Sequence, residues 1–277
     1  MASHTLTLER VSYAFTPEKW AAHEITAAFE PGKLTVLIGP NGSGKTTLLR
    51  LAAGLLPLQS GKVMLGNSEV ARIPRRERAR LIALLPQREE SLPDMTAIDM
   101  VLLGRTPHLS LLAQEKPQDR DLAMAAMEKT GVAHLYGRSL ATLSGGELQR
   151  VGIARVLCQD TPVLLLDEPV ASLDIGHQAA VMELLSQLTK EQNLCVACVL
   201  HDLNLAAHFA DHVVLLSGGE LRRAGGPEAV LTEELLLNAY GVRVHRLSSG
   251  ERFALTPDFN KVHTSGGQWM AGERKSS

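Results

Sequence analysis

The glycine-rich stretch "GPNGSGKTT" at residues 39–47 limits, more than any other feature, what this chain can fold into. It follows the apolar run "KLTVLIG", which predicts a buried strand, and it opens the helical pattern "KTTLLRLAAGLL". In this strand–loop–helix context the stretch is typical of a phosphate-binding loop, because small residues let consecutive backbone N–H groups turn toward a phosphate at a helix N-terminus. The residues predicted to bind a nucleotide here are Gly39, Pro40, Asn41, Gly42, Ser43, Gly44, Lys45, Thr46 and Thr47.

Four side chains of this loop and of a later strand predict the chemistry. Lys45 would bridge the β- and γ-phosphates, and Thr46 would ligate Mg²⁺. In "VLLLDEP", Asp167 ends a buried strand and would hold Mg²⁺ through water. The next residue, Glu168, would orient and deprotonate the attacking water. An acidic pair after a strand also suits a helix cap, but beside a phosphate loop it predicts a nucleotide hydrolase.

A second helix start suited to an anion stands at "LSGGELQR", residues 143–150. Ser144 and Glu147 have capping-box spacing, and an ordinary capped helix is one interpretation. However, Gly145 and Gly146 each cost the helix about 1 kcal/mol of stability, so close approach of another backbone or ligand is expected there. A phosphate at the helix N-terminus would meet that need.

The rest of the pattern predicts an α/β fold with one interrupted domain. The near-continuous apolar runs "TPVLLLDEP" and "LCVACVLHD", with a helix between them, imply a mainly parallel sheet covered on both faces. Short strands are expected over residues 3–38, in an antiparallel N-terminal β subdomain, and a hairpin and a last helix after residue 211. We expect one domain over residues 1–263, with a P-loop NTPase core (1–87 and 143–245) and a helical insertion (88–142). A polar tail (264–277) is expected to follow the domain.

Composition and charge narrow the function. A net charge of −2 gives no excess of basic residues, so a nucleic-acid binder is disfavoured. No run of 18 apolar residues exists, and the N-terminus lacks the apolar core of a secretory signal, which predicts a cytoplasmic protein whose membrane role needs a partner. Cys195 and Cys198 have a metal-like spacing, but i and i+3 on a strand face opposite ways, so two core residues are expected.

The motifs, in their order along residues 5–245, resemble those of the nucleotide-binding subunit of an ABC (ATP-binding cassette) transporter. They are an aromatic near the start, "GPNGSGKTT", "LLPQ", "LSGGE", "LLLDEP", "SLD" and "VLHDLN". In this family the "LSGGE" helix binds the γ-phosphate of an ATP held by the other subunit. The resemblance implies that Ser144, Gly145 and Gly146 act in this way. It further implies that Tyr13 stacks on adenine, Gln87 ligates Mg²⁺ and reports nucleotide state to the insertion, Asp174 works at the dimer interface, and His201 contacts the γ-phosphate and attacking water.

Three further stretches resemble ATPases of importers for iron–siderophore complexes, haem and cobalamin: "LGRTPH" (103–108), "LDIGHQ" (173–178) and "HDLNLAAHFAD" (201–211). The resemblance implies ATP and Mg²⁺ as ligands, a homodimer, a permease, an extracytoplasmic substrate-binding protein and a place on the cytoplasmic membrane face. The alternative is a non-transport ABC ATPase, such as an iron–sulfur assembly factor. Met95, Met100 and Leu109 are expected either to receive a permease helix or to pack the insertion's own core.

Overall fold

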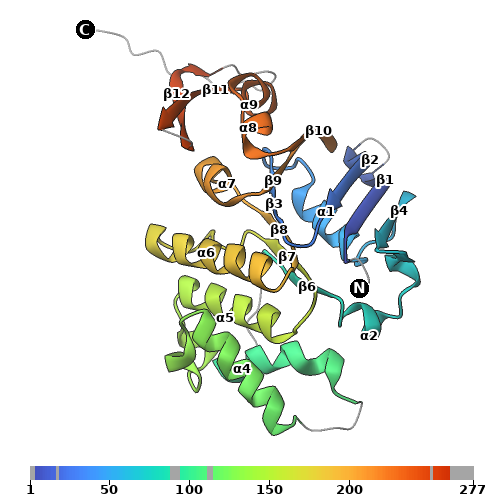
Figure 1. Cartoon of the computed structure of the whole chain (residues 1–277), viewed down its shortest axis with the longest axis vertical. Helices are drawn as coiled ribbons and strands as arrows, with labels where there is room; N and C mark the ends of the chain where they lie inside the picture. Colours follow the sequence, from blue (N-terminus) through green and yellow to red (C-terminus); the bar gives the residue numbers. More distant parts are fainter. Residues whose placement is uncertain (1–3, 17–18, 88–93, 111–114, 250–251, 263–277) are drawn as a thin grey trace.

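The computed structural model describes residues 4–16, 19–87, 94–110, 115–249 and 252–262 (Figure 1). Its centre is a six-stranded sheet in the order β10-β9-β3-β8-β7-β6. The strands from β9 to β6 are parallel, and β10 is antiparallel to β9 at one edge. The bounds are β3 Leu34–Ile38, β6 Ile82–Leu85, β7 Val163–Asp167, β8 Cys195–Val199, β9 His212–Ser217 and β10 Glu220–Gly225. The prediction of a mainly parallel sheet is confirmed.

Both faces of this sheet are buried, as the unbroken apolar strands require. In β8, Cys195 packs toward the N-terminal sheet, whereas Cys198 packs toward the helices on the other face. The two cysteines therefore lie on opposite faces, and both are fully buried. This confirms the interpretation of the pair as core residues.

A second, antiparallel sheet is formed mostly by the N-terminal segment and has the order β2-β1-β4-β5. Its strands are β1 Leu6–Thr16, β2 Lys19–Phe29, β4 Ser60–Leu65 and β5 Ser68–Glu69. The expectation of short strands was wrong for β1 and β2, which have 11 residues each. Their pairing contains several register shifts, and Arg10 and Glu24 adopt positive φ angles of 48° and 47° beside them. Such bulges interrupt the apolar alternation by which a long strand would be predicted.

Helices cover the two faces of the central sheet unequally. Helix α1 (Lys45–Ala52) packs between that sheet and the N-terminal sheet, where it shares one apolar core with both. Helices α5 (Gly145–Cys158) and α6 (Ile175–Glu191) cover the opposite face, together with α7 (Leu203–Phe209) (Figure 1). The remaining short elements before the insertion are the 3₁₀ turn η1 (Val70–Arg72) and α2 (Arg75–Arg78).

The described part of the insertion is helical, as predicted. It contains α3 Ala97–Leu102, the 3₁₀ segment η2 Leu103–His108, α4 Pro117–Lys129, and the short 3₁₀ turns η3 Ala133–Leu135 and η4 Leu140–Thr142. Thr96 caps α3 in a capping box with Asp99. A separate apolar core joins α3 and α4 to one side of α5. Met100 is buried in that core, which confirms for this residue the second of the two expectations, and Met95 packs partly against the same core.

The C-terminal part contains more structure than the sequence predicted. The β9–β10 hairpin is confirmed, and α8 (Pro227–Val230) and α9 (Glu233–Tyr240) follow it. A further antiparallel hairpin of β11 (Val242–Ser249) and β12 (Arg252–Val262) was not predicted. The Asn204 side chain on α7 fixes this hairpin, because its amide donates to the Leu255 carbonyl and accepts from the Leu255 N–H.

In the described ranges, no helix has both the length and the apolar character needed to cross a membrane.

Candidate nucleotide-hydrolysis site

The glycine loop joins the end of β3 to the start of α1, and its shape depends on the glycines. Gly39, Gly42 and Gly44 have φ angles of 148°, 77° and 99°. A Cβ at Gly39 would lie 2.1 Å from the Leu216 carbonyl oxygen, and one at Gly44 would lie 1.9 Å from that of Ala21. At Gly42, by contrast, no heavy atom lies within 4 Å of such a Cβ. The loop is therefore packed tightly on the protein side and has open space at Gly42, as a phosphate cradle requires.

Lys45, the first residue of α1, is folded back over this loop. Its Nζ donates to the carbonyl oxygens of Gly39 (2.8 Å) and Pro40 (2.9 Å). The side chain is buried, and this burial lowers the pKa of Lys45, while the nearby carboxylates of Glu168 and Asp167 oppose the shift. The loop thus holds an ammonium group beside the open space at Gly42.

Thr46 and Asp167 form a pair of oxygen ligands next to Lys45. The Thr46 Oγ1 lies 3.1 Å from Asp167 Oδ1, at the carboxyl end of β7. Asp167 is 2% exposed, and burial raises its pKa, opposed by the Thr46 hydrogen bond. A hydroxyl and a carboxylate at a buried, anionic position are the ligands that Mg²⁺ prefers in proteins, so these residues fit that ion.

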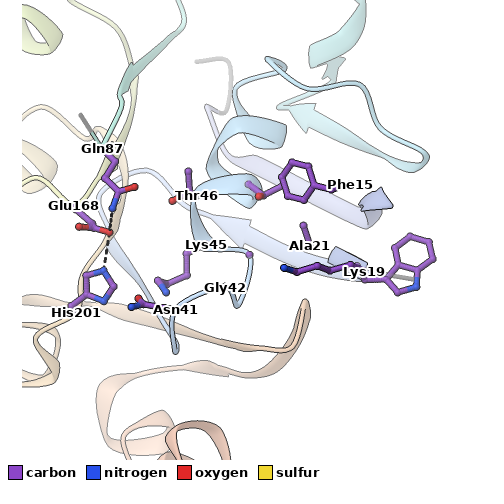
Figure 2. Close-up of a pocket in the computed structure, with 13 residues that line it drawn as sticks. Phe15, Lys19, Ala21, Asn41, Gly42, Lys45, Thr46, Gln87, Glu168 and His201 are labelled. Atoms are coloured by element: carbon purple, nitrogen blue, oxygen red, sulfur yellow. Dashed lines mark hydrogen bonds and ion pairs between the residues drawn. The ribbon is translucent and has the colours of Figure 1, made fainter. Parts of the chain in front are cut away.

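Glu168 lies at the centre of a cluster from three adjacent strand ends (Figure 2). Its Oε1 lies 2.6 Å from Gln87 Nε2 and 2.8 Å from His201 Nε2. Gln87 follows β6, Glu168 follows β7 and His201 follows β8. Polar side chains at the carboxyl ends of parallel strands meet at one sheet edge, which is where ligands bind in open α/β sheets.

A pocket of about 630 Å³ connects the Glu168 cluster to the glycine loop. Figure 2 shows Gln87, Glu168 and His201 on one side, Lys45 and Thr46 in the middle, and Phe15, Lys19 and Ala21 on the other. The residues predicted from sequence that line the pocket are Asn41, Gly42, Gly44, Lys45, Thr46, Thr47, Gln87, Glu168 and His201. Four further lining residues were not predicted from the sequence: Phe15, Lys19, Trp20 and Ala21. Their only signal was the aromatic and basic side chains near the β1–β2 connection.

Tyr13, the aromatic residue predicted to contact the base, is not among the residues that line this pocket. It packs partly against the core shared by the two sheets and contacts the Phe15 ring edge-on, with 5.2 Å between ring centroids. Phe15 is 62% exposed and lines the pocket. The geometry therefore favours Phe15 over Tyr13 as the residue that would meet an adenine.

The second predicted anion site lies at the N-terminus of α5, and Asp174, predicted for the dimer interface, lies at the N-terminus of α6. None of these residues lines the pocket. Ser144 caps α5 in the predicted capping box with Glu147, and Asp174 caps α6 by accepting from the His177 N–H. Both caps lower a pKa: the Ser144 N–H lowers that of the Glu147 carboxyl, and the His177 N–H lowers that of the Asp174 carboxyl.

The glycines of the second site differ in what surrounds them. A Cβ at Gly146 would lie 3.3 Å from both Leu173 Cδ2 and the Ser172 carbonyl oxygen, so packing inside the chain favours glycine there. At Gly145 the nearest atom would be 3.8 Å away, which is an ordinary contact. Packing among the described residues therefore does not explain the glycine at position 145.

Comparisons with known proteins agree with this geometry. Residues 22–171 match the family model described as ABC transporter. The chain is 41% identical over 222 residues to the ferric enterobactin transport ATP-binding protein FepC of Escherichia coli (strain K12), covering 80% of this chain and 82% of the relative. It is 42% identical over 232 residues to the hemin import ATP-binding protein HmuV of Gloeobacter violaceus (strain ATCC 29082 / PCC 7421), covering 81% and 83%.

A solved structure with the same fold carries nucleotide. It is a dimeric ATP-binding cassette in a post-hydrolysis state bound to ADP and Pi, with a TM-score of 0.72 and 27% identity, covering 80% of this chain and 98% of that one. The fold, the phosphate loop with its acidic strand end, and the matches to relatives all lead to one assignment. The chain belongs to the ABC transporter family, as an ATP-binding subunit that hydrolyses ATP to power transport.

Proposed function

We propose that this chain powers the import of a metal chelate through a partner permease, from the cytoplasmic face of the membrane. The observation that carries the ATPase part is the Glu168 carboxylate, held by Gln87 and His201 at the end of a pocket whose other parts are Lys45 and Thr46. The cargo class is supported by relatives named for transport of ferric enterobactin and hemin.

In this proposal the phosphates lie along the glycine loop, and Thr46, Asp167 and Gln87 hold Mg²⁺. Bound there, Mg²⁺ would supply positive charge that offsets the negative charge developing during hydrolysis. Lys45 turns its ammonium from the loop carbonyls to the β- and γ-phosphates. Glu168 accepts a proton from the attacking water, and His201, on the same carboxylate oxygen, contacts the γ-phosphate and the water.

A complete site also needs a second copy of the chain. Ser144, Gly145 and Gly146 would close on the nucleotide of the partner copy, and Asp174 would lie at the shared interface. Two observations support this. These residues lie outside the pocket of their own chain. At position 145, the described residues leave room for a side chain, so their packing does not explain the glycine there. The domain division proposed above, with residues 88–142 as the insertion, puts this helix start directly after the insertion.

The test of the proposed function is transport itself. The chain, co-purified with its permease and reconstituted in vesicles with the matching extracytoplasmic binding protein, should drive ATP-dependent accumulation of an iron–siderophore complex, haem or cobalamin. Vesicles without ATP, or with a non-hydrolysable analogue, are the controls. ATP hydrolysis without uptake of any of the three chelates would contradict the cargo class.

The Phe15→Ala variant should weaken ATP binding about tenfold, because stacking of a base on an aromatic side chain contributes about 1–3 kcal/mol. Its kcat at saturating ATP should stay near that of the wild type, since Phe15 lies far from Glu168 across the pocket (Figure 2). A titration with a fluorescent ATP analogue measures the affinity. Tyr13→Ala is the comparison, and we expect its affinity for ATP to change less than about twofold. If Tyr13→Ala lost more affinity for ATP than Phe15→Ala, Tyr13 and not Phe15 would be the residue that stacks on the adenine.

The surface that we propose for the permease is an apolar groove between α2 and η2, of about 590 Å³. Two hydrogen bonds connect the region of α2 to η2: the Nε atoms of Arg76 and Arg80 both donate to the Pro107 carbonyl oxygen, at 3.1 and 2.8 Å. Leu109 lines the groove, and Arg75 and Arg76 flank it. A short cytoplasmic helix of the permease would fit this groove if its apolar side chains packed against Leu109 and an acidic residue paired with the flanking arginines.

The Leu109→Glu variant should lower ATP-driven chelate uptake at least about fivefold, because a central interface contact contributes more than about 1 kcal/mol. The ATPase rate and the melting temperature of the isolated subunit should remain those of the wild type, since Leu109 is not in its core. Met100→Glu provides the contrast and should melt at a lower temperature, because Met100 is 4% exposed. Unchanged uptake in Leu109→Glu would place the permease elsewhere.

A further inference from the structure

The backbone of Glu168 adopts a conformation that its own residue type disfavours. Its φ angle is +53°, in the left-handed region, where the Cβ of a non-glycine residue lies too close to the backbone. Of the five non-glycine residues with positive φ in the described part of the chain, only Glu168 lines the nucleotide pocket. Such a conformation persists only where the surroundings hold it.

Hydrogen bonds hold both ends of this residue. At the side chain, Oε1 is bonded by Gln87 and His201. At the backbone, the carbonyl oxygen accepts from the Ala171 N–H at 3.3 Å and from Gln149 Nε2 at 3.1 Å. The bond from Ala171 closes the turn after β7 and is local, whereas the bond from Gln149 comes from α5, a separate element.

Gln149 lies five residues after Ser144, about 7.5 Å along the axis of α5 at 1.5 Å per residue. Its side chain is half-buried between α5 and the loop that follows β7. Helix α5 begins at the proposed contact with the partner's nucleotide. The same helix therefore contacts, through Gln149, the backbone of Glu168, the proposed general base of its own chain. A helix moves as a rigid element, so a displacement of its N-terminus reaches Gln149 directly.

We propose that Gln149 is a positioning residue for Glu168: its amide holds the Glu168 carbonyl, keeps the left-handed backbone, and aims the carboxylate at the attacking water when α5 is correctly placed. The inference rests on the proposed role of Glu168 as the general base. Without the amide, only the local bond from the Ala171 N–H holds this carbonyl, so the backbone of Glu168 relaxes toward ordinary φ values and the carboxylate turns away from the γ-phosphate. Nucleotide binding does not depend on this bond, because Gln149 does not line the pocket.

The Gln149→Met variant tests the proposal, because methionine has a similar length and no N–H donor. Its kcat should fall about tenfold, while the Kd for ATP and the melting temperature stay close to those of the wild type. Gln178→Met is the matched control: Gln178 Nε2 on α6 donates to the Val170 carbonyl at 3.3 Å, so it makes the same kind of bond to the same loop, two residues further on. This control should keep a kcat within about twofold of the wild type.

The double variant separates positioning from a general structural role. If Gln149 acts only through the Glu168 carboxylate, Gln149→Met added to Glu168→Gln should leave the residual ATPase rate where Glu168→Gln alone puts it. An unchanged kcat in Gln149→Met would overturn the proposal. So would a further loss in the double variant, or an equal loss in Gln178→Met. These rates are measured on the isolated chain without permease or chelate, so a failure of the proposed import function would not alter them.

Discussion

The Glu168→Gln variant is expected to bind Mg·ATP with nearly wild-type affinity and to hydrolyse it at least about 10²-fold more slowly, the lower range for loss of a general base. Glutamine keeps the size of the side chain and an oxygen that accepts from Gln87 and His201, but it cannot take a proton from water. The measurements are the steady-state ATPase rate at saturating Mg·ATP and the Kd from an equilibrium titration.

Glu183→Gln is the control for this substitution, because Glu183 is an exposed residue on α6 that does not line the pocket. It should hydrolyse ATP at the wild-type rate. An ATPase rate in Glu168→Gln within a few-fold of the wild type would remove Glu168 from the role of base. The proposal that Gln149 positions Glu168 depends on that role, so the same result would also overturn that proposal.

Nucleotide-dependent dimerisation should depend on Ser144. With ATP, Glu168→Gln should run as a homodimer in light scattering, because the uncleaved γ-phosphate continues to join the two copies, whereas the nucleotide-free chain should be mostly monomeric. Adding Ser144→Arg should abolish the dimer and leave ATP binding unchanged. The arginine puts a bulky side chain at the N-terminus of α5, where the partner's phosphate would approach, and Ser144 lies outside the pocket of its own chain.

Loss of the helix cap itself must be separated from loss of the interface, since an N-cap substitution costs about 1 kcal/mol. Thr232→Arg serves this purpose, because Thr232 caps α9 by accepting from the Leu235 N–H, at a helix start outside the proposed interface. In the Glu168→Gln background it should still dimerise with ATP. A dimer that forms regardless of nucleotide and of Ser144 would contradict the composite site.

The sequence predicted those parts of the site that depend on local pattern. The glycine loop, Lys45 and Thr46 follow one strand directly, and Asp167 and Glu168 end another, so spacing and periodicity were enough to assign them. The aromatic residue at the base end was not predictable in this way. Register shifts surround Tyr13 in its pairing with β2, so the facing of residues 13 and 15 does not follow from simple alternation.

Contacts between distant segments were the second limit. Gln87 and His201 are 81 and 33 residues from Glu168, and their meeting at one carboxylate oxygen depends on the order β8-β7-β6 in the sheet. Gln149 gave no signal either, since a polar residue on a helix ordinarily faces solvent. The β11–β12 hairpin was missed because charged and polar residues interrupt the apolar ones in both segments, and few of its described residues are buried, among them Val244 and Leu255.

The burial of the three cysteines has a practical consequence for spectroscopy. Cys158, Cys195 and Cys198 are the only cysteines of the chain, and burial raises their pKa values to about 11, 12 and 12. The thiolate is the reactive form of cysteine, and almost no thiolate is present at these positions at neutral pH. Maleimide and methanethiosulfonate reagents should therefore react very slowly with the three native cysteines. The natural chain is therefore a ready background for spin labels or fluorophores. One cysteine introduced at Ile175, which is 86% exposed at the start of α6, would carry the label alone and report the separation of two copies.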